Sequence, residues 1–440
     1  MAFGLVAQFL QFGSALALIP FMVTRLSTAE VGLWFVFVAA QGLAIISDFG
    51  FQPTLVRAFA LGQAGAERLE RQGLGSSAGL EPRPPNAQLL AAALGAAKRL
   101  YRWIAAVILF VLLAAGLPYM TMLARDGGVA ESMVQLAWVI FSINIALILL
   151  FQWITPLLMG TGRIQQNYLF LIANRGLYAI VGIVVLLAGG GLVALAVAAV
   201  AGQIASRAVA QFLIAPAAAP LRRIKVTAGE RAATLAAIWP NASRMGVVAI
   251  GAFLINRYTL FAISSFIGVA AAAPYALSLQ MLMAVGAVAQ LPMLITTPQI
   301  VALRVRHDRA GLRQLLARNL GLFVLLFLLG AVAAAVVVPW LLILIGSRTA
   351  LLPTGTLLLL SLVLMLEGFH STAASFITTR NEVPFVPAAL ISGLCVGILT
   401  TLAGWLGGGI AIMIACQGLV QLAYNNWRWP LAAWKEVRAE

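Results

Sequence analysis

Long apolar runs separated by short polar connectors extend through the whole chain. The runs lie at residues 3–24, 31–57, 100–123, 133–158, 166–188, 192–215, 235–256, 270–299, 317–345, 353–378, 384–406 and 408–430. A helix of about 20 apolar residues crosses the roughly 30 Å hydrocarbon core of a bilayer. The pattern therefore predicts an all-α polytopic membrane protein of about 12 transmembrane helices.

The runs fall into two sets. We predict an N-terminal six-helix bundle over residues 1–215, a cytoplasmic connector over 216–234, a C-terminal six-helix bundle over 235–430 and a cytoplasmic tail over 431–440. The predicted first helix ends with Val-Thr-Arg at Arg25, and the predicted seventh helix ends with Ile-Asn-Arg at Arg257. This echo predicts like-oriented repeats with Arg25 and Arg257 at their outward ends. Transporters built from such repeats hold substrate at the repeat interface.

Basic residues are distributed unequally between alternate connectors. Most of the 28 Lys and Arg residues lie in one set, whereas the other set holds only Arg25, Arg125, Arg257 and Arg348, and four more arginines lie inside predicted helices. Because cytoplasmic loops carry an excess of positive charge, both termini are predicted to be cytoplasmic. The Gly-Ser and Pro-rich loop at 59–99 is predicted to be mobile. The arginine-rich segment 301–318 is either a helix lying on anionic headgroups or a solvated loop.

Composition supports a membrane protein and argues against several other classes. Hydrophobic residues make up 62% of the chain and charged residues 9%. The net charge of +15 does not indicate nucleic-acid binding, because the basic residues lie in short connectors. Cys395 and Cys416 lack metal-ligand spacing, and no G-x-x-x-x-G-K-[ST] loop occurs. The short outward loops display no acid–base pair, so we predict no metal, no cofactor and no enzymatic activity.

Ionisable residues within the apolar runs are candidates for function, because a charge in hydrocarbon is costly unless it faces a cavity or a partner. These residues are Asp48, Arg57, Arg175, Arg207, Arg244 and Glu367. At about 1.5 Å per helical residue, Arg175, Arg207 and Arg244 lie about 12–14 Å from the predicted cytoplasmic helix ends. The carboxylates are too few to neutralise these arginines, so a cation is predicted to face water or an anionic ligand.

Each candidate also has a structural interpretation. Arg57 lies near a helix end, from which its guanidinium could reach the membrane interface. The deeper arginines could instead pair with Asp48 or Glu367. Otherwise the fixed charge and planar fork of arginine match phosphate oxygens, which suits a pyrophosphate-bearing substrate.

Glu367 and His370 are spaced i, i+3 and therefore share a helix face. A carboxylate beside an imidazole can exchange protons near neutral pH, which makes the pair a candidate for ion coupling. In the alternative interpretation, Glu367 is a counter-ion to an arginine and His370 is a hydrogen-bonded packing residue. Asn174, directly before Arg175, is either polar glue between helices or a ligand contact.

Short motifs carry a resemblance to a known family. The text P-F-M-V-T-R-L-S-T-A-E-V-G-L-W at 20–34, followed by S-D-F-G-F at 47–51 and Arg57, resembles the Wzx-type lipid-linked oligosaccharide flippases. These form the polysaccharide-transporter branch of the multidrug/oligosaccharidyl-lipid/polysaccharide flippase superfamily. N-R-Y at 256–258 and P-Y-A-L-S-L-Q at 274–280 are a second echo, while the long loop at 59–99 departs from the family pattern.

The resemblance implies a multi-pass flippase of the inner (cytoplasmic) membrane. It would move a polyprenyl-pyrophosphate-linked oligosaccharide outward for O-antigen or exopolysaccharide assembly, by alternating access around a cationic cavity. Arg175, Arg207 and Arg244 would hold the pyrophosphate, with Arg57 and Asp48 shaping its cytoplasmic entrance. The implied partners are this substrate, the lipid bilayer and, as a further candidate, the polysaccharide polymerase machinery.

Two other functions stay open. A drug or organic-cation extruder of the same superfamily would need acidic cavity residues to attract cations. A membrane glycosyltransferase or ligase acting on lipid-linked sugars would need a large outward loop lined with carboxylates.

Overall fold

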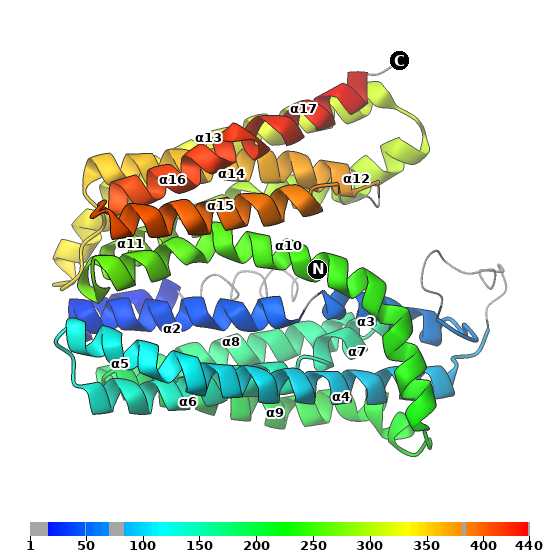
Figure 1. The fold of residues 1–440 in the computed structure, drawn as a ribbon. Coiled ribbons are helices and arrows are strands. Elements are labelled where there is room, and N and C mark those ends of the chain that lie inside the picture. The colour runs from blue at the N-terminus through cyan, green and yellow to red at the C-terminus, as the bar shows by residue number, and fades with distance from the viewer. Residues whose placement is uncertain (1–15, 49, 70–82, 381–383, 439–440) are drawn as a thin grey trace. The chain divides into compact units, whose positions relative to one another are not determined.

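The computed structural model describes residues 16–48, 50–69, 83–380 and 384–438, and every regular element in these ranges is a helix (Figure 1). The chain divides into two compact units. The N-terminal unit comprises Met1–Leu26 and Phe37–Ala249, and the C-terminal unit comprises Ser27–Val36 and Ile250–Glu440. The predicted all-α class is confirmed.

Two long helices contribute to both units: α2 (Thr28–Ser47) and α10 (Ala228–Phe266). The N-terminal unit also contains the helix Leu16–Arg25, α3 (Phe51–Gln63), α4 (Ala87–Val111), the π-helix η1 (Leu112–Gly116), α5 (Leu117–Asp126), α6 (Glu131–Leu150), α7 (Ile154–Gly160), α8 (Ile164–Leu187) and α9 (Leu192–Arg222). The C-terminal unit also contains α11 (Val269–Ala289), α12 (Leu291–Val305), α13 (Arg309–Leu344), α14 (Thr354–Thr378), α15 (Val386–Trp405), α16 (Ile410–Ala423) and α17 (Asn425–Arg438).

The predicted apolar runs correspond to these helices. Each run from 31–57 onward coincides with one helix or with successive helices. In the ranges that the structure describes, nine segments are long and apolar enough to cross a membrane, and Leu16–Arg25 and Thr28–Gly42 are shorter apolar helices. The polytopic architecture therefore agrees with the pattern, while the count of about 12 spans and the orientation of the termini stay predictions.

Two predicted loops are shorter in the structure. The loop at 59–99 is helical at both ends, because α3 continues to Gln63 and α4 begins at Ala87; its centre at 70–82 lies outside the described residues. Segment 301–318 is formed by the end of α12 and the start of α13, which are joined by a tight turn in which His307 has a φ of 55°. Arg306 lies in this turn, and the other arginines of the segment lie in the two helices.

The predicted last run at 408–430 is interrupted. A break at Tyr424 separates α16 from α17, and the residues expected as a tail are helical up to Arg438. Trp429, Ala433 and Val437 bury one face of α17 in the core of the C-terminal unit. This amphipathic face explains why a helix with so many polar residues is stable there.

A second break separates α2 from α3 at the S-D-F-G-F motif. Gly50 has a φ of 68°, a left-handed conformation that glycine adopts without steric cost. The Asp48 carboxylate accepts the backbone N–H of Gln52 at 3.1 Å and so satisfies one of the free donors in the first turn of α3.

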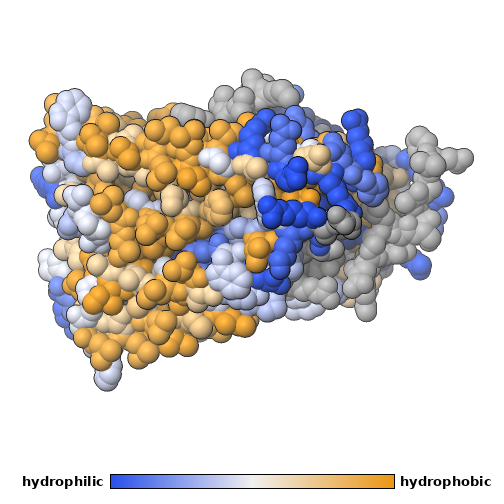
Figure 2. All heavy atoms as spheres, turned by 90° about the horizontal axis from the view of Figure 1, so that it is seen from above, coloured by the Kyte–Doolittle hydropathy of each residue, from blue (hydrophilic) through white to orange (hydrophobic). Residues whose placement is uncertain are grey.

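Each unit has its own apolar core. The N-terminal core includes Phe59, Tyr101 and Trp153, and the C-terminal core includes Phe376 and Trp429. Large apolar side chains also lie on the outside, and Phe212 and Ile343 are 82% and 80% exposed. Figure 2 shows apolar side chains over most of the face that contains α13 and α17, with polar side chains gathered toward one end. Exposed apolar surface of this extent is typical of contact with lipid.

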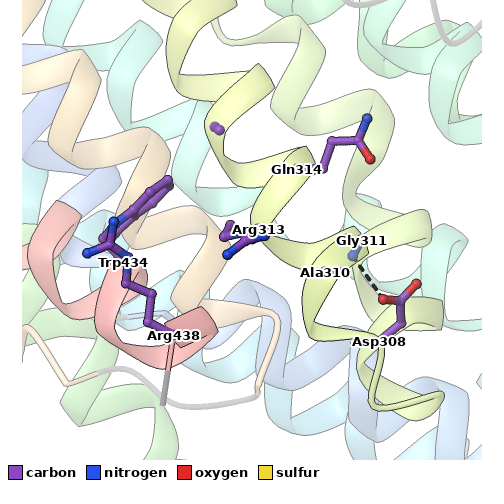
Figure 3. Close-up of a pocket in the computed structure, with 8 residues that line it drawn as sticks. Asp308, Ala310, Gly311, Arg313, Gln314, Trp434 and Arg438 are labelled. Atoms are coloured by element: carbon purple, nitrogen blue, oxygen red, sulfur yellow. Dashed lines mark hydrogen bonds between the residues drawn. The ribbon is translucent and has the colours of Figure 1, made fainter. Parts of the chain in front are cut away.

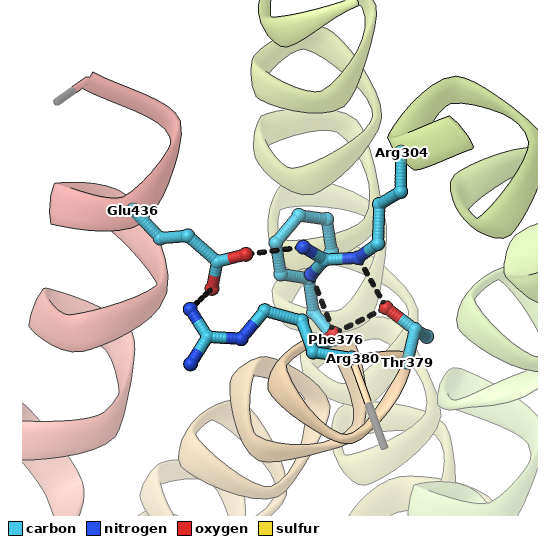
Figure 4. Close-up of polar contacts among 5 residues, drawn as sticks. All are labelled: Arg304, Phe376, Thr379, Arg380 and Glu436. Atoms are coloured by element: carbon cyan, nitrogen blue, oxygen red, sulfur yellow. Dashed lines mark hydrogen bonds and ion pairs between the residues drawn. The ribbon is translucent and has the colours of Figure 1, made fainter. Parts of the chain in front are cut away.

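The arginine-rich end of the C-terminal unit is held together by one partly buried ion-pair network (Figure 4). Arg304 of α12 pairs with Glu436 of α17, and it donates to Thr379 Oγ1 at 2.6 Å and to the Phe376 carbonyl at 3.0 Å. Arg380 Nη1 lies 3.5 Å from Oε2, the other carboxylate oxygen of Glu436. The network therefore joins α12, the end of α14 and α17.

Candidate functional site

Arg207 of α9 is a charged residue whose neighbours in the N-terminal unit are mainly aromatic. Its guanidinium lies 4.6 Å from the centre of the Phe151 ring and 5.2 Å from that of Phe170. Its Nη2 donates to Gln203 Oε1 at 3.0 Å, while Nε and Nη1 are buried and have no hydrogen-bond partner among the described residues. Two aromatic faces and one amide therefore hold this cation, without a carboxylate in the described part of the chain.

Polar side chains beside Arg207 link α8 to α9. Asn174 Nδ2 donates to Gln203 Oε1 at 3.1 Å and to Ser206 Oγ at 3.0 Å. Asn174 is thus polar glue between helices, one of its two predicted roles. Because Gln203 Oε1 accepts from both Asn174 and Arg207, the network fixes the position of the guanidinium.

Arg175 lies on α8, half-buried, and Tyr178, three residues later, is its electrostatic neighbour. No ion pair or hydrogen bond involves the Arg175 guanidinium in the described ranges. Pairing of Arg175 or Arg207 with Asp48 or Glu367, the structural alternative considered for the deep arginines, is therefore not observed there.

Asp48 is buried at the break between α2 and α3, where it positions the backbone. Tyr101 of α4 donates its hydroxyl to Asp48 Oδ1, and the other oxygen caps α3. Two elements of the N-terminal unit are thereby fixed to each other. The carboxylate acts through neutral donors and is not a counter-ion to a described arginine.

Arg57 lies one to two turns into α3 and lines a small cavity of about 20 Å³ together with Thr54, Leu69 and Ile238. A cavity of this size holds about one water molecule. Arg244 lies in α10, but its side chain is outside the described residues, so its predicted role stays a prediction. Arg25 is exposed at the end of its helix, and its outward position stays a prediction.

Arg257 was expected at an outward helix end, and this prediction is wrong. Helix α10 continues to Phe266, so Arg257 lies well inside the span Gly246–Phe266. The polar triplet at 256–258 has the composition expected at a membrane interface. In the structure, its polar partners instead come from other helices. Tyr275 of α11 is the electrostatic neighbour of Arg257.

Glu367 lies in a buried polar cluster formed by α10, α11, α14 and α16. Gln417 Nε2 donates to Glu367 Oε2 at 3.4 Å, and Asn256 is a second hydrogen-bond partner of this carboxyl group. Thr259 donates to Gln417 Oε1 at 3.3 Å and contacts the Tyr275 hydroxyl. We call these five residues the C-terminal polar cluster.

His370 is one turn from Glu367 but has a different partner. Its Nδ1 lies 2.8 Å from Asn426 Oδ1 of α17. The predicted Glu367–His370 contact is not among the hydrogen bonds of the described residues; each side chain is held by amides from other helices. The two residues therefore occupy separate polar environments on α14.

Most of these partners could not be recognised from intramembrane charge. Gln203, Gln417 and Tyr275 are uncharged and resemble other polar residues of the apolar runs. The spacing of Gln203 and Arg207 by four residues was a usable signal, because such residues are neighbours on a helix.

Comparison with known proteins identifies the fold. No family model matches the sequence, and no curated protein matches it. Among solved structures, an inward-facing multidrug resistance transporter of the MATE family aligns at a TM-score of 0.68 and 14% identity, covering 98% of this chain and 94% of that chain. The lipid II flippase MurJ, in an inward closed conformation, aligns at 0.59 and 13%, covering 99% and 87%.

A third solved structure is a MOP superfamily transporter from Pyrococcus furiosus, reported with a reversed polarity of its binding pocket. It aligns at a TM-score of 0.52 and 12% identity, covering 99% of this chain and 94% of that chain. The alignments extend over nearly the whole chain, and their low identities limit the conclusion to architecture. This chain has the fold of the MOP superfamily transporters.

Proposed function

We propose that this protein is a secondary transporter that flips a polyprenyl-pyrophosphate-linked oligosaccharide across the cytoplasmic membrane for surface polysaccharide biosynthesis. The observation that carries the proposal is Arg207, a half-buried cation with two buried guanidinium nitrogens that have no hydrogen-bond partner and no carboxylate beside it among the described residues. Arg175 on the packed neighbour α8 is a second cation without a described counter-ion.

The chemistry of these arginines favours an anionic ligand. A buried donor without a partner destabilises a fold, so a protein that retains one commonly has a functional use for it. Guanidinium N–H groups bind phosphate oxygens in pairs. We propose that Arg207 and Arg175 bind the pyrophosphate, that Arg244 and Arg57 contribute further positive charge, and that Asp48 holds the helix that carries Arg57.

The fold supports a transporter whose two helical bundles move so that the substrate site opens alternately to the two sides of the membrane. MurJ, one of the solved structures with this fold, is named a lipid II flippase, and a lipid-linked sugar is the substrate class proposed here. We propose that Glu367 and His370 couple transport to an ion gradient, since both are ionisable groups inside the C-terminal unit.

A second candidate function rests on Glu367. This carboxyl group is held by amides and forms no ion pair in the described part of the chain, so it could attract an organic cation. One of the solved structures with this fold is a multidrug resistance transporter of the MATE family. Extrusion of an organic cation is therefore the alternative to be tested beside flipping.

Transport in proteoliposomes distinguishes these functions. A defined polyprenyl-pyrophosphate oligosaccharide is placed in the bilayer, and its exposure is scored by the access of a glycosidase added outside. We expect protein-dependent exposure that is lost in Arg207→Ala and retained in Arg102→Ala, which removes an exposed arginine of α4 in the same unit.

The same vesicles test the alternative with a fluorescent organic cation. Accumulation of the cation that depends on Glu367, together with no exposure of several lipid-linked sugars, would replace the flippase by a drug extruder. Exposure that survives in Arg207→Ala at wild-type rate would remove this residue from the substrate site.

A further inference from the structure

A groove between α13 and α17 is separate from the residues proposed for transport. It lies within the C-terminal unit and has a volume of about 750 Å³. Figure 3 shows Arg313 and Gln314 projecting from α13, and Trp434 and Arg438 from α17. Ala310 also lines the groove. The lining of the groove therefore includes guanidinium and amide donors and an indole ring.

Positive charge exceeds negative charge in the lining of this groove. The Arg438 guanidinium lies 5.1 Å from the centre of the Trp434 ring, within the range of a cation–π contact. Asp308 also lines the groove, but its Oδ1 accepts the Gly311 N–H at 2.9 Å and caps α13. Arg313 and Arg438 together outnumber this single carboxylate.

Glu436, the nearest acid on α17, faces a different partner. Its carboxylate binds Arg304 and Arg380 in the network of Figure 4. Residues two positions apart on a helix do not face each other, so Glu436 and Arg438 project in different directions. The ion-pair network thus leaves Arg438 available to a ligand in the groove.

The exposed face of α13 continues from the groove into apolar surface. Ala317, Gly321, Leu325, Leu328 and Val332 follow at helical spacing. The position beside Gly321 is open, and Leu325 and Val332 are 53% and 63% exposed. From Ala317 to Val332 this face is about 22 Å long at 1.5 Å per residue, more than half of a roughly 30 Å hydrocarbon core.

We propose that this groove binds the phosphate of an anionic glycerophospholipid, whose acyl chains lie along the exposed face of α13. Arginine pairs suit phosphate oxygens, Trp is favoured at membrane interfaces, and basic pockets beside membrane helices bind lipid headgroups. The continuous apolar path selects a lipid over a soluble phosphate. Because arginines are in excess at this end of the C-terminal unit, the lipid is expected to come from the cytoplasmic leaflet.

Native mass spectrometry of the full chain measures this binding without any transport substrate. Delipidated protein is titrated with phosphatidylglycerol and, separately, with phosphatidylcholine. We expect one phosphatidylglycerol to bind more tightly, and its affinity to fall about tenfold or more in the double variant Arg313→Ala, Arg438→Ala.

The matched control is Arg306→Ala with Arg318→Ala, which removes the same charge from exposed positions outside the groove lining. It should retain the affinity of the wild type. Ala317→Trp fills the groove and keeps both arginines, so it should also lose the lipid; if this variant does not fold, the two double variants decide.

Three results would overturn the proposal. Equal loss in both double variants would indicate diffuse surface charge. Displacement of the lipid by glycerophosphoglycerol, the headgroup without chains, at equal concentration would indicate a soluble phosphate site. Preferential retention of a polyprenyl phosphate would assign the groove to the substrate. Failure of flipping in proteoliposomes would leave the lipid measurement unaffected, so the two proposals fail independently.

Discussion

The two units differ in how the ionisable side chains inside them are hydrogen-bonded. In the N-terminal unit, Arg207 lies between two aromatic rings with a single amide partner, and two of its three guanidinium nitrogens have no hydrogen-bond partner among the described residues. In the C-terminal unit, Glu367 is bound by Gln417 and Asn256. One unit therefore holds a cation whose hydrogen bonds are mostly unmade among the described residues, and the other holds a carboxyl group bound by two amides.

This difference distinguishes a residue that is available to bind a ligand from residues that stabilise the fold. A polar group whose partners are all supplied by the protein stabilises the fold, whereas an unpartnered one lowers stability until a ligand supplies the missing contacts. The comparison supports the proposal that Arg207 binds a ligand. The C-terminal polar cluster links helices, and protonation there would alter those links.

The largest expected effect is on transport by Arg207 variants. Replacement by Gln removes the charge and should reduce flipping about 100-fold, while Lys keeps the charge without the planar fork and should reduce it about tenfold. The rate of sugar exposure in proteoliposomes, at matched protein levels, measures both. Equal rates in the Gln and Lys variants would show that charge at this position is irrelevant.

The apolar runs could be recognised from sequence because lipid requires about 20 apolar residues per helix wherever the helix packs. The partners of the polar residues could not. Tyr101 lies 53 residues after Asp48 in the chain, and Gln417 lies 50 residues after Glu367. Helix facing is set by packing between distant segments, which hydropathy does not encode.

The same limit explains the error at Arg257. A polar triplet at the end of an apolar run has the same composition whether it meets water or buried partners. Only the position of Tyr275 on α11 distinguishes the two cases. The break at Asp48, in contrast, had a local signal, since an Asp two residues before a glycine is a common way to end one helix and begin another.

A stability measurement should give opposite signs in the two units. Arg207→Met removes a cation with two buried nitrogens that lack hydrogen-bond partners among the described residues, and it should stabilise the protein by about 1–3 kcal/mol. Glu367→Leu leaves Gln417 and Asn256 without their acceptor and should destabilise it by about the same amount. Thermal unfolding in detergent, with Glu367→Gln as the near-neutral control, tests both; destabilisation by Arg207→Met would contradict the contrast.

A smaller effect is expected where charge is paired at the end of the C-terminal unit. Glu436→Gln weakens the bonds to Arg304 and Arg380 and should cost about 1 kcal/mol, because the network is only partly buried. The matched change Glu131→Gln, at an exposed pair with Arg125, should shift the unfolding temperature less. A larger shift in Glu131→Gln would show that partial burial adds nothing to these pairs.

The smallest effect is a pH dependence at the start of α10, in the N-terminal unit. Glu230 accepts the Thr227 N–H at 2.7 Å and the Thr227 hydroxyl at 2.8 Å, forming a capping box, and Gln88 donates to it at 2.8 Å. These bonds lower the pKa of Glu230 below its ordinary value of 4.5, with the bond from Gln88 the largest cause.

Because the folded-state pKa is the lower one, the cap is fully formed above the ordinary value and is lost as pH falls through the folded value. Hydrogen exchange of the first turn of α10, corrected for intrinsic rates, should therefore show more protection in the wild type than in Glu230→Gln at pH 7. The difference should vanish when the pH falls below the lowered pKa of Glu230. A difference that persists unchanged into acid would mean that the charge of Glu230 does not contribute to this cap.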